Sequence, residues 1–375
     1  MTAPDPLAWL SQKAEVRHRA GLQRALVPRS AQHTTVDFAS NDYLQLSRDP
    51  RVVAAAVDAA ARWGTGATGS RLVTGTIDLH TELEDALAEL TGAPRALVFS
   101  SGYLANLAVL TALAGRDCVI VADAGNHASL IDGCRLANSR LVTVDHGDLA
   151  AAEEALSTRT ESRALLVIDA INSVFGDLLP LERWHATARR HGALLLVDDA
   201  HGIGVRGDGR GSCWEAGIAG ESDVVVTVTL SKSLGSQGGA MLGDPRVIDH
   251  VLNTARPFIF DTGLNPPAAG AALAAIQIVR ESPELAQRLM GRAADIASAL
   301  GSQPTDAAIL SWTVGASQEA LDLAAGLRDR GVHVGCFRPP SVAIGSAGLR
   351  ITANTGHTDA EVHLLARTLS SLVTS

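Results

Sequence analysis

The sequence predicts an α/β fold in which a mainly parallel β-sheet is covered by helices and is followed by a smaller α+β domain. Two observations support this prediction. Short apolar runs rich in β-branched residues alternate with longer helical stretches along the first two thirds of the chain. Because these runs are apolar on both faces, they are typical of strands buried between two layers of helices.

Six apolar runs are predicted to be strands of this sheet. They are residues 95–99, 118–123, 140–145, 163–170, 192–199 and 223–230. A helix is predicted before the first run, where Leu79, Leu83, Leu87 and Leu90 fall on one helical face. This helix is expected to end at Gly92, a residue type that commonly follows the last turn of a helix.

Changes in the residue pattern divide the chain into three parts. Residues 1–44 are expected to form an N-terminal helical arm, residues 45–264 the large α/β domain, and residues 265–375 the small α+β domain. In the last part, long stretches rich in alanine and leucine replace the alternation of strands and helices. Two short β-rich segments and an amphipathic helix follow them.

The composition argues against several classes of partner. The 375 residues are 46% hydrophobic, and the net charge of -9 lacks the basic excess that favours nucleic acid or an anionic membrane. The four cysteines lack C-x-x-C spacing, so neither a zinc site nor a disulfide framework is indicated. No secretory leader is recognised, and no apolar run reaches the length of a membrane span. We expect a cytoplasmic protein that binds no metal, nucleic acid or membrane.

Two glycine-rich segments match dinucleotide-binding motifs, but their context does not fit. Residues 64–69 follow a predicted helix where the motif requires a strand. Residues 202–207 lead into a turn instead of a helix that could hold a pyrophosphate. The pattern therefore disfavours a nicotinamide-dependent dehydrogenase.

A single lysine follows the last predicted strand. Of the 31 basic residues only Lys13 and Lys232 are lysine, and the others are arginine. An amine, unlike a guanidinium, can lose its proton and attack a carbonyl carbon. Lys232 is therefore a candidate for a covalent bond to an aldehyde, although a loop lysine without such a role explains this stretch equally well.

Two further strand ends carry residues that suit pyridoxal phosphate. The first predicted strand leads into a helix at Gly102, where the N–H groups of Gly102 and Tyr103 could bind a phosphate. Asp198 ends another strand and could keep a ring nitrogen protonated, while His201 could meet the phenolic oxygen or the ring. Taken singly, this D-D-x-H segment is also read as an Asx turn or a metal site. Because parallel strands end at one edge of a sheet, we expect these groups to lie near Lys232.

The chain resembles the α-oxoamine synthase family of fold-type I pyridoxal phosphate enzymes. The resemblance runs over nearly the whole length, through FASNDYL, GATGSRLVTGT, LHTELEDALAEL, SSGYLANL, NHASLIDG, LLLVDDAHGIGVRGDGRG, TLSKSLGSQGG, RPFIFDTGL and CFRPPSV. So many motifs in order are far more specific than any one of them. The resemblance implies a seven-stranded, mainly parallel sheet, bound pyridoxal 5'-phosphate, and a homodimer with sites formed between subunits.

The resemblance also implies an activity. It is greatest to the members that condense L-alanine with pimeloyl-CoA or a pimeloyl-carrier protein and release carbon dioxide. Another α-oxoamine synthase, using glycine or serine and a different acyl-CoA, is the alternative. A fold-type I aminotransferase would share the lysine and the acid but would need no thioester.

Roles for individual residues are carried over from the family. The resemblance implies a catalytic set of Lys232, His127 and Asp198. It implies that the cofactor is bound by Gly102, Tyr103, His127, Ser173, Asp198, His201, Thr229 and Lys232. It implies that the substrates are bound by Arg24, Asn41, His127, Ser341 and Arg350.

Three positions depart from the family pattern. Gln45 stands in NDYLQL where relatives commonly carry a glycine that eases a turn. In INSVFGD, Asn172 and Phe175 replace an aromatic and an acidic residue of the related VFSMDGD, while Ser173 matches its serine.

Overall fold

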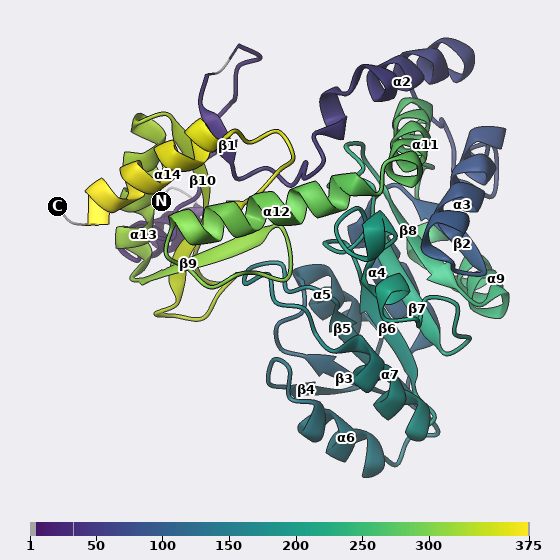
Figure 1. Cartoon of the computed structure of the whole chain (residues 1–375). Coiled ribbons are helices and arrows are strands. Elements are labelled where there is room, and N and C mark those ends of the chain that lie inside the picture. Colours follow the sequence, from purple (N-terminus) through teal and green to yellow (C-terminus); the bar gives the residue numbers. More distant parts are fainter. Residues whose placement is uncertain (1–4, 33, 374–375) are drawn as a thin grey trace.

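The structure, a computed structural model, describes residues 5–32 and 34–373. The chain forms a large lobe around one sheet and a smaller lobe around a second sheet (Figure 1). The long helix α12 (Glu284–Ala299) runs from the large lobe to the small one.

The large lobe contains a seven-stranded sheet. In spatial order its strands are β2 (Arg95–Phe99), β8 (Gly239–Gly243), β7 (Val224–Thr229), β6 (Leu194–Asp198), β5 (Arg163–Asp169), β3 (Cys118–Asp123) and β4 (Arg140–Val144). β8 is antiparallel to β2 and β7, and the other neighbouring strands are parallel. The predicted mainly parallel sheet is therefore confirmed. The six strands predicted from the sequence are present within a residue or two of their expected bounds.

Within the large sheet, β8 is the strand that the sequence pattern did not predict, because GAMLG contains no β-branched residue. Packing explains its small residues. A Cβ on Gly239 would lie 2.3 Å from the backbone nitrogen of Gly102. Glycine thus lets β8 pass directly against the N-terminus of α4 (Gly102–Leu113), which brings this helix to the edge of the sheet.

Helices cover both faces of the sheet, and alternate strand residues point into the two layers. Leu165 and Val167 of β5 belong to one core, and Leu166 and Ile168 belong to the other. The first layer is formed by α4, α5 (Ala128–Leu136), α9 (Pro245–Thr254) and α10 (Arg256–Ile259). The second is formed by α3 (Asp78–Thr91), α6 (Leu149–Ser157), α7 (Leu181–Arg190), the short α8 (Ser212–Glu215) and α11 (Pro266–Glu281). As predicted, α3 ends at Gly92, whose φ is 74°.

The small lobe contains a four-stranded sheet. Its order is β1 (Val36–Phe38), β10 (Val332–Phe337), β11 (Ala347–Thr352) and β9 (Ile309–Gly315). β1 pairs with β10 in parallel, so a segment from the predicted N-terminal arm completes the sheet of the C-terminal part. The helices α12, α13 (Ser317–Asp329) and α14 (Asp359–Val373) pack with this sheet. The arm also contains α1 (Ala8–Arg19), which has no buried residue.

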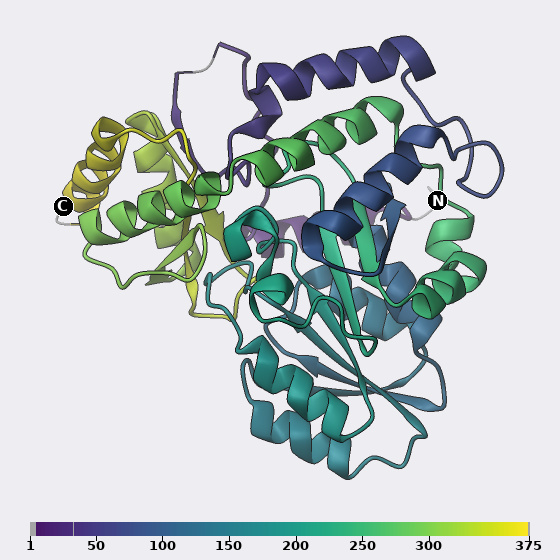
Figure 2. The ribbon, with the colours of Figure 1, turned by 45° about the vertical axis from the view of Figure 1, so that its right-hand side comes forward.

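The predicted boundary between residues 264 and 265 stays a prediction. α11 follows it in the sequence, yet this helix packs against α2 (Pro50–Trp63) and α3 of the large lobe (Figure 2). α2 directly precedes the glycine-rich residues 64–69, as the sequence analysis expected. Among the described helices, none combines the length and the hydropathy needed to cross a lipid bilayer. The expected cytoplasmic location stays a prediction.

Gln45 occupies a backbone conformation that favours glycine. Its φ is 59° and its ψ is 29°, and it precedes the short 3-10 helix η1 (Leu46–Arg48). A left-handed conformation costs a non-glycine residue roughly 1 kcal/mol. Asp42 holds the turn, because its Oδ1 accepts the backbone N–H of Leu46 at 3.0 Å.

Candidate active site

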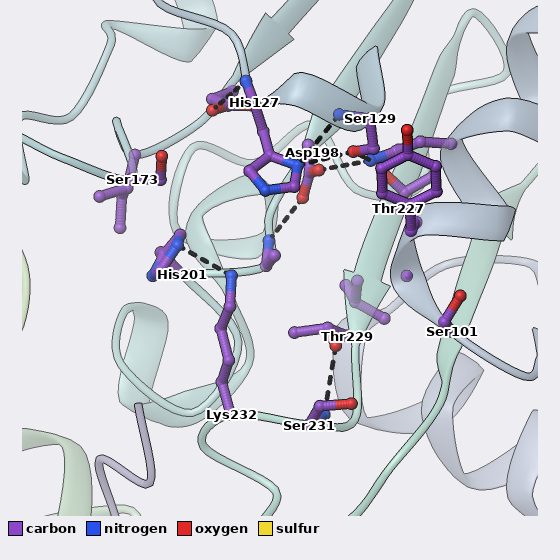
Figure 3. A pocket seen from close by; sticks show the side chains of 17 residues that line it. Ser101, His127, Ser129, Ser173, Asp198, His201, Thr227, Thr229, Ser231 and Lys232 are labelled. Atoms are coloured by element: carbon purple, nitrogen blue, oxygen red, sulfur yellow. Dashed lines mark hydrogen bonds between the residues drawn. The ribbon is translucent and has the colours of Figure 1, made fainter. Parts of the chain in front are cut away.

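A cavity of about 220 Å³ lies at the carboxyl ends of the parallel strands (Figure 3). The neighbouring strands β5, β6 and β7 end at Asp169, Asp198 and Thr229, and all three residues line the cavity. Lys232 reaches it from the turn after β7, and Gly102 reaches it from the start of α4. The predicted meeting of strand ends at one edge is therefore what the structure contains.

The amine of Lys232 points toward His201, with 2.8 Å between Nζ and Nε2 (Figure 3). Burial lowers the pKa of Lys232 to about 8; the Asp198 carboxylate opposes this shift, and the Arg350 guanidinium adds to it. Burial also lowers the pKa of His201 well below its ordinary value, so this imidazole is neutral at neutral pH. An amine that titrates near pH 8 is available as a nucleophile or a base under ordinary conditions.

Asp198 is buried at the end of β6, and both of its carboxylate oxygens have donors. Oδ1 accepts the backbone N–H of Ala200 at 3.0 Å, and Oδ2 accepts the amide of Asn106 at 2.6 Å. Asn106 also donates to Ser129 at 2.8 Å and accepts the hydroxyl of Thr227 at 2.6 Å. These contacts fix the direction in which the Asp198 carboxylate meets the cavity.

His127 stands at the N-terminus of α5. Its Nδ1 lies 2.7 Å from the hydroxyl of Ser129, and its backbone N–H donates to Oδ2 of Asp169 at 3.0 Å. Loss of solvent around the ring lowers the pKa of His127, and the charge of Asp198 opposes this shift. The other oxygen of Asp169, Oδ1, is buried without a hydrogen-bond partner in the described chain. Burial, with the charge of Asp198, raises the pKa of Asp169 well above its ordinary value.

The N-terminus of α4 and the end of β7 form a small polar cup. A Cβ on Gly102 would lie 3.2 Å from the Cβ of Thr229, so glycine permits this approach. Ser101 caps the helix, because its hydroxyl accepts the N–H of Leu104 at 3.2 Å. Within residues 5–32 and 34–373 the N–H groups of Gly102 and Tyr103 have no acceptor. Free N–H groups at a helix N-terminus are suited to a phosphate.

Arg350 lies on β11 of the small sheet and is only 5% exposed. Its Nε donates to the backbone oxygen of Ser173 at 2.7 Å, and its Nη1 donates to Oδ1 of Asn41 at 3.0 Å. The hydrogen-bond partners that the structure gives to this guanidinium are all neutral. Among the residues that the structure describes, this buried cation therefore has no carboxylate partner, and it lies beside the cavity.

Tyr43 connects Arg350 to the lysine side of the site. Its hydroxyl lies 2.8 Å from Nδ1 of His201 and donates to Oδ1 of Asn41 at 3.0 Å. The hydroxyl oxygen of Tyr43 also accepts a hydrogen bond from Nη2 of Arg350 at 3.4 Å. Since the other ring nitrogen of His201 faces Lys232, one hydroxyl links the guanidinium to the amine through a single imidazole.

Of the five predicted substrate residues, His127 lines the cavity and the other four do not. Arg350 contacts the lining residue Ser173 and Asn41 contacts Arg350, whereas Arg24 and Ser341 lie farther away. Arg24 is exposed and lies past the end of α1, and Ser341 is exposed in the turn after β10. Arg338 joins their two segments, because its guanidinium donates to the backbone oxygens of Gly21 and Gln23. The structure thus brings Arg24 and Ser341 into one neighbourhood on the small lobe but not to the cavity.

The sequence analysis missed three polar residues of the site. Asn106 has a readable signal, because it is the polar residue in the otherwise apolar run LANLAVL of α4. Asp169 ends its strand just as Asp198 does, and the two are paired neighbours in the sheet. Tyr43 lies inside the quoted FASNDYL motif, but no role was assigned to it from the sequence; it is fully buried.

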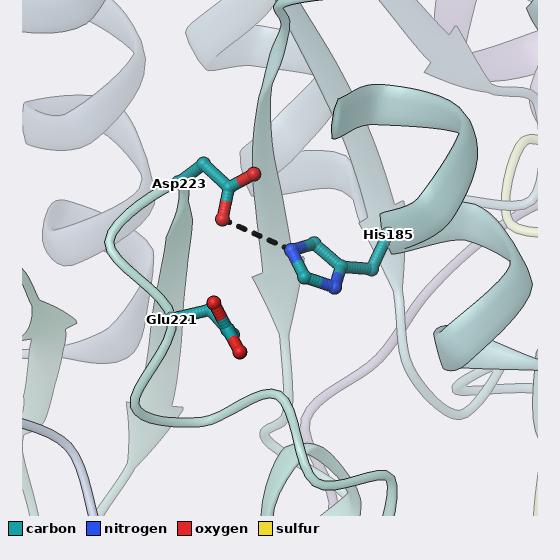
Figure 4. A group of neighbouring side chains, drawn as sticks. All are labelled: His185, Glu221 and Asp223. Atoms are coloured by element: carbon teal, nitrogen blue, oxygen red, sulfur yellow. Dashed lines mark hydrogen bonds and ion pairs between the residues drawn. The ribbon is translucent and has the colours of Figure 1, made fainter. Parts of the chain in front are cut away.

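A second group of His and acidic residues lies at the opposite edge of the sheet (Figure 4). His185, Glu221 and Asp223 lie close together, with 3.0 Å between Nε2 of His185 and Oδ1 of Asp223. The guanidinium of Arg189 donates to both carboxylates and lowers the pKa of Asp223. Because a fixed cation already occupies this place, the group is a structural ion-pair network.

The comparison with known proteins agrees with this architecture. Residues 33–369 match the family model for class I and II aminotransferases. The 8-amino-7-oxononanoate synthase of Mycolicibacterium gilvum (strain PYR-GCK) is 51% identical over 98% of this chain and 97% of that protein. The protein of the same name from Mycobacterium bovis (strain BCG / Pasteur 1173P2) is 49% identical over 98% of this chain and 96% of that protein.

Solved structures give the same result. The Sphingomonas wittichii serine palmitoyltransferase matches with a TM-score of 0.91 and 30% identity, covering 99% of this chain and 98% of that one. The 8-amino-7-oxononanoate synthase of Francisella tularensis matches with a TM-score of 0.77 and 25% identity, covering 91% of this chain and 98% of that one. The predicted fold-type I class and family resemblance are confirmed. The chain belongs to the class I and II aminotransferase family and, within it, to the 8-amino-7-oxononanoate synthases.

Proposed function

We propose that this chain condenses L-alanine with a pimeloyl thioester to give 8-amino-7-oxononanoate, a free thiol and carbon dioxide, as a step of biotin biosynthesis. The observation that supports this most directly is Arg350, a 5% exposed guanidinium with neutral partners. Burying an uncompensated charge is costly, and a planar guanidinium binds a carboxylate at two points. The carboxylate of the amino-acid substrate would supply the missing charge.

The residues of the cavity fit pyridoxal 5'-phosphate. The unpartnered N–H groups of Gly102 and Tyr103, with the hydroxyl of Thr229, would hold its phosphate. Asp198 would pair with its ring nitrogen, and the amine of Lys232 would bond to its aldehyde carbon.

Three further cavity residues would complete the binding of the cofactor. His127 would stack on the ring, while His201 and Ser173 would lie near the phenolic oxygen. When bound, the cofactor supplies an electron sink for the charge left on the substrate Cα.

Four side chains of the protein would then bind the amino acid and assist the reaction. Arg350 holds the alanine carboxylate, which fixes the direction of the Cα–H bond. The amine of Lys232 would accept the Cα proton, and its pKa of about 8 in the cofactor-free chain suits a base near neutral pH. His127 stands where it could donate to the oxygen charge that develops as the thioester carbonyl is attacked. Asn41, which contacts Arg350, keeps the guanidinium in place.

The acyl donor would be pimeloyl-CoA or a pimeloyl-carrier protein. We propose that Arg24, on the segment joined to β10 by Arg338, meets the far carboxylate of the acyl chain, with Ser341 nearby. A second candidate function is condensation of L-serine with a long acyl-CoA. It is favoured by the TM-score of 0.91 to a serine palmitoyltransferase, against 0.77 for the synthase from Francisella tularensis.

We propose a homodimer as the working form. Leu72, Val73 and Phe260 are 49%, 78% and 69% exposed, and the isolated bridge between Ser70 and Thr262 joins their two segments. Such a group of exposed apolar side chains is suited to burial against a second copy. Light scattering of the purified protein at micromolar concentration would give twice the chain mass, and a monomer would contradict the proposal.

One experiment tests the reaction. The purified protein with added cofactor is incubated with L-alanine, glycine or L-serine and with pimeloyl-CoA or palmitoyl-CoA, and thiol release is followed. Mass spectrometry of the mixture with L-alanine and pimeloyl-CoA should detect 8-amino-7-oxononanoate. Thiol release that requires L-serine and palmitoyl-CoA would favour the second candidate. Amino-group transfer without thiol release would contradict both.

A further inference from the structure

His146 lies outside the cavity, at the start of the loop between β4 and α6, and takes no part in the proposed reaction. We infer that His146 is a positioning residue that joins the loop ending at His127 to the turn carrying Ser173. This inference rests on the proposed function, because it gives His127 and Arg350 their roles there.

The imidazole of His146 is held between two carboxylates. Its Nδ1 lies 2.7 Å from Oδ1 of Asp123, and its Nε2 lies 2.7 Å from Oδ2 of Asp177. Because a carboxylate only accepts, both ring nitrogens donate and the ring is an imidazolium. The hydrogen bonds to Asp123 and Asp177 raise the pKa of His146 to about 10. The ring therefore stays charged throughout the neutral range.

On one side, His146 supports the loop that leads from β3 to His127. Asp123, which ends β3, also accepts the backbone N–H groups of Gly125 at 2.6 Å and Gly147 at 2.8 Å. A Cβ on Gly125 would lie 2.5 Å from Nδ1 of His146, so the loop backbone packs directly on the ring. His127 is two residues further on, which ties its backbone position to the ring.

On the other side, His146 supports the turn after β5. Asp177 is part of this turn, since its backbone oxygen accepts the N–H of Asn172 at 3.0 Å. The turn also carries the backbone oxygen of Ser173, the acceptor for Nε of Arg350 at 2.7 Å. The amide of Asn172 donates to the backbone oxygen of Gly125 at 3.1 Å and so joins the turn to the loop a second time.

The turn also contacts the small lobe. The hydroxyl of Thr305 donates to the backbone oxygen of Gly176 at 3.3 Å, and a Cβ on Gly176 would lie 2.4 Å from the backbone oxygen of Ile309. The turn therefore lies between the two sheets, and His146 holds its large-lobe side. Removing the imidazolium would leave two facing carboxylates that repel each other and would free the turn that positions Arg350.

The first test separates the two substrates. His146→Ala should raise KM for L-alanine about tenfold, because the acceptor of Arg350 is displaced, and should change KM for the acyl donor less than about twofold. Asp177→Asn should act in the same direction. In the double variant the two effects should not add, because both changes release the same turn. Additive effects, or equal changes in both KM values, would overturn the inference.

Controls keep the test independent of folding and of the proposed reaction. Asp145→Asn removes an exposed acid one residue away and should leave both KM values unchanged. Binding of L-alanine, followed by the cofactor absorbance, gives a second readout that needs no acyl donor. If the wild-type protein releases no thiol, the proposed function fails, whereas the inference fails if alanine binding is the same with and without His146.

The second test measures the protonation of His146 directly, first in the wild-type protein and then in one variant. In the wild-type protein the imidazole nitrogens of His146, observed by ¹⁵N NMR, should both carry protons from pH 6.5 to pH 8.5, well beyond the ordinary histidine pKa of about 6.5. The pKa of His146 depends on Asp123 and Asp177, the two charged groups that face it. Asp177→Asn should lower this pKa. A neutral ring at pH 7.5 in the wild type would overturn the inference.

Discussion

The two edges of the large sheet use similar residues in opposite ways. At the amino edge, Arg189 forms ion pairs with both Glu221 and Asp223, so these two carboxylates have a fixed cationic partner. At the carboxyl edge, Arg350 has neutral partners, and burial moves the pKa of Lys232 to about 8. The difference teaches that a titratable cluster becomes reactive when the protein leaves its charges uncompensated, and becomes structural when it pairs them.

The largest expected effect is at the carboxyl edge. Lys232→Ala would remove the side chain that we propose bonds to the cofactor aldehyde and acts as the base, so kcat should fall by at least about 10³-fold. Borohydride should no longer fix the cofactor to the protein. A borohydride-stable adduct in this variant would show that another residue holds the cofactor.

A smaller loss is expected from Asp198→Asn. The cofactor should still bind, but an amide stabilises a protonated ring nitrogen poorly, so kcat should fall about 10²- to 10³-fold. Solvent exchange of the alanine Cα–H, measured by NMR, isolates the proton-transfer step. Unchanged exchange would exclude the role given to Asp198.

Arg350→Ala tests whether the guanidinium of Arg350 binds the carboxylate of L-alanine. KM for L-alanine should rise about 10²-fold, because two charge-assisted hydrogen bonds are lost, while KM for the acyl donor should change much less. Tyr43→Phe is the milder companion, since it removes one neutral contact to the same guanidinium. An equal loss for both substrates would mean that Arg350 has a structural role.

Lys232→Met tests the cost of leaving an amine buried. In the cofactor-free protein the pKa of Lys232 is lowered, so the buried charge destabilises the folded state at and below pH 8. The substitution should therefore raise the free energy of unfolding at pH 7 by on the order of 2 kcal/mol. This gain should shrink as the pH rises from 8 toward 10.5, where the lysine becomes neutral in both states. Urea unfolding at pH 7 and pH 10 measures the difference.

The smallest effect is expected at the amino edge. Asp223→Asn should leave kcat and both KM values unchanged and should lower the free energy of unfolding by about 0.5–1 kcal/mol, the usual contribution of a partly exposed ion pair. Because Arg189 lowers the pKa of Asp223, this contribution is present at neutral pH and is lost as the pH falls through the acid range. A fall in kcat would show that the group around Asp223 contributes to the activity and would contradict the structural role given to it.

The sequence predicted those strands whose own residues show a strand pattern. Runs of β-branched residues gave six strands of the large sheet, and their ends gave Asp198 and Lys232. β8 was not predicted, because its small residues are required by its contact with the start of α4 and do not show a strand pattern. The three-residue strand β1 was not predicted, because it is a strand only through its pairing with β10, which lies far along the chain.

The site shows the same division. Family motifs supplied the individual residues of the cavity, and the order of strand ends placed them at one edge. The contacts among them required coordinates, because Tyr43, Asn41 and Arg350 come from segments that no local pattern joins. His146 was missed for the same reason, since its two carboxylates follow different strands.

The pairing of β1 with β10 has a consequence for synthesis of the protein. Val36 lies opposite Val332, so a ribosome releases the second partner about 300 residues after the first, on the order of 15–60 s later. Asn41 and Tyr43 follow β1 directly, so they too are made long before the strand that pairs with β1. The strands of the large sheet, in contrast, have all been synthesised by residue 243. The contacts of Arg350 with Asn41 and Tyr43 can therefore form only late in synthesis, and a nascent chain that stops before Arg350 carries Lys232 without the guanidinium that we propose binds the amino-acid carboxylate.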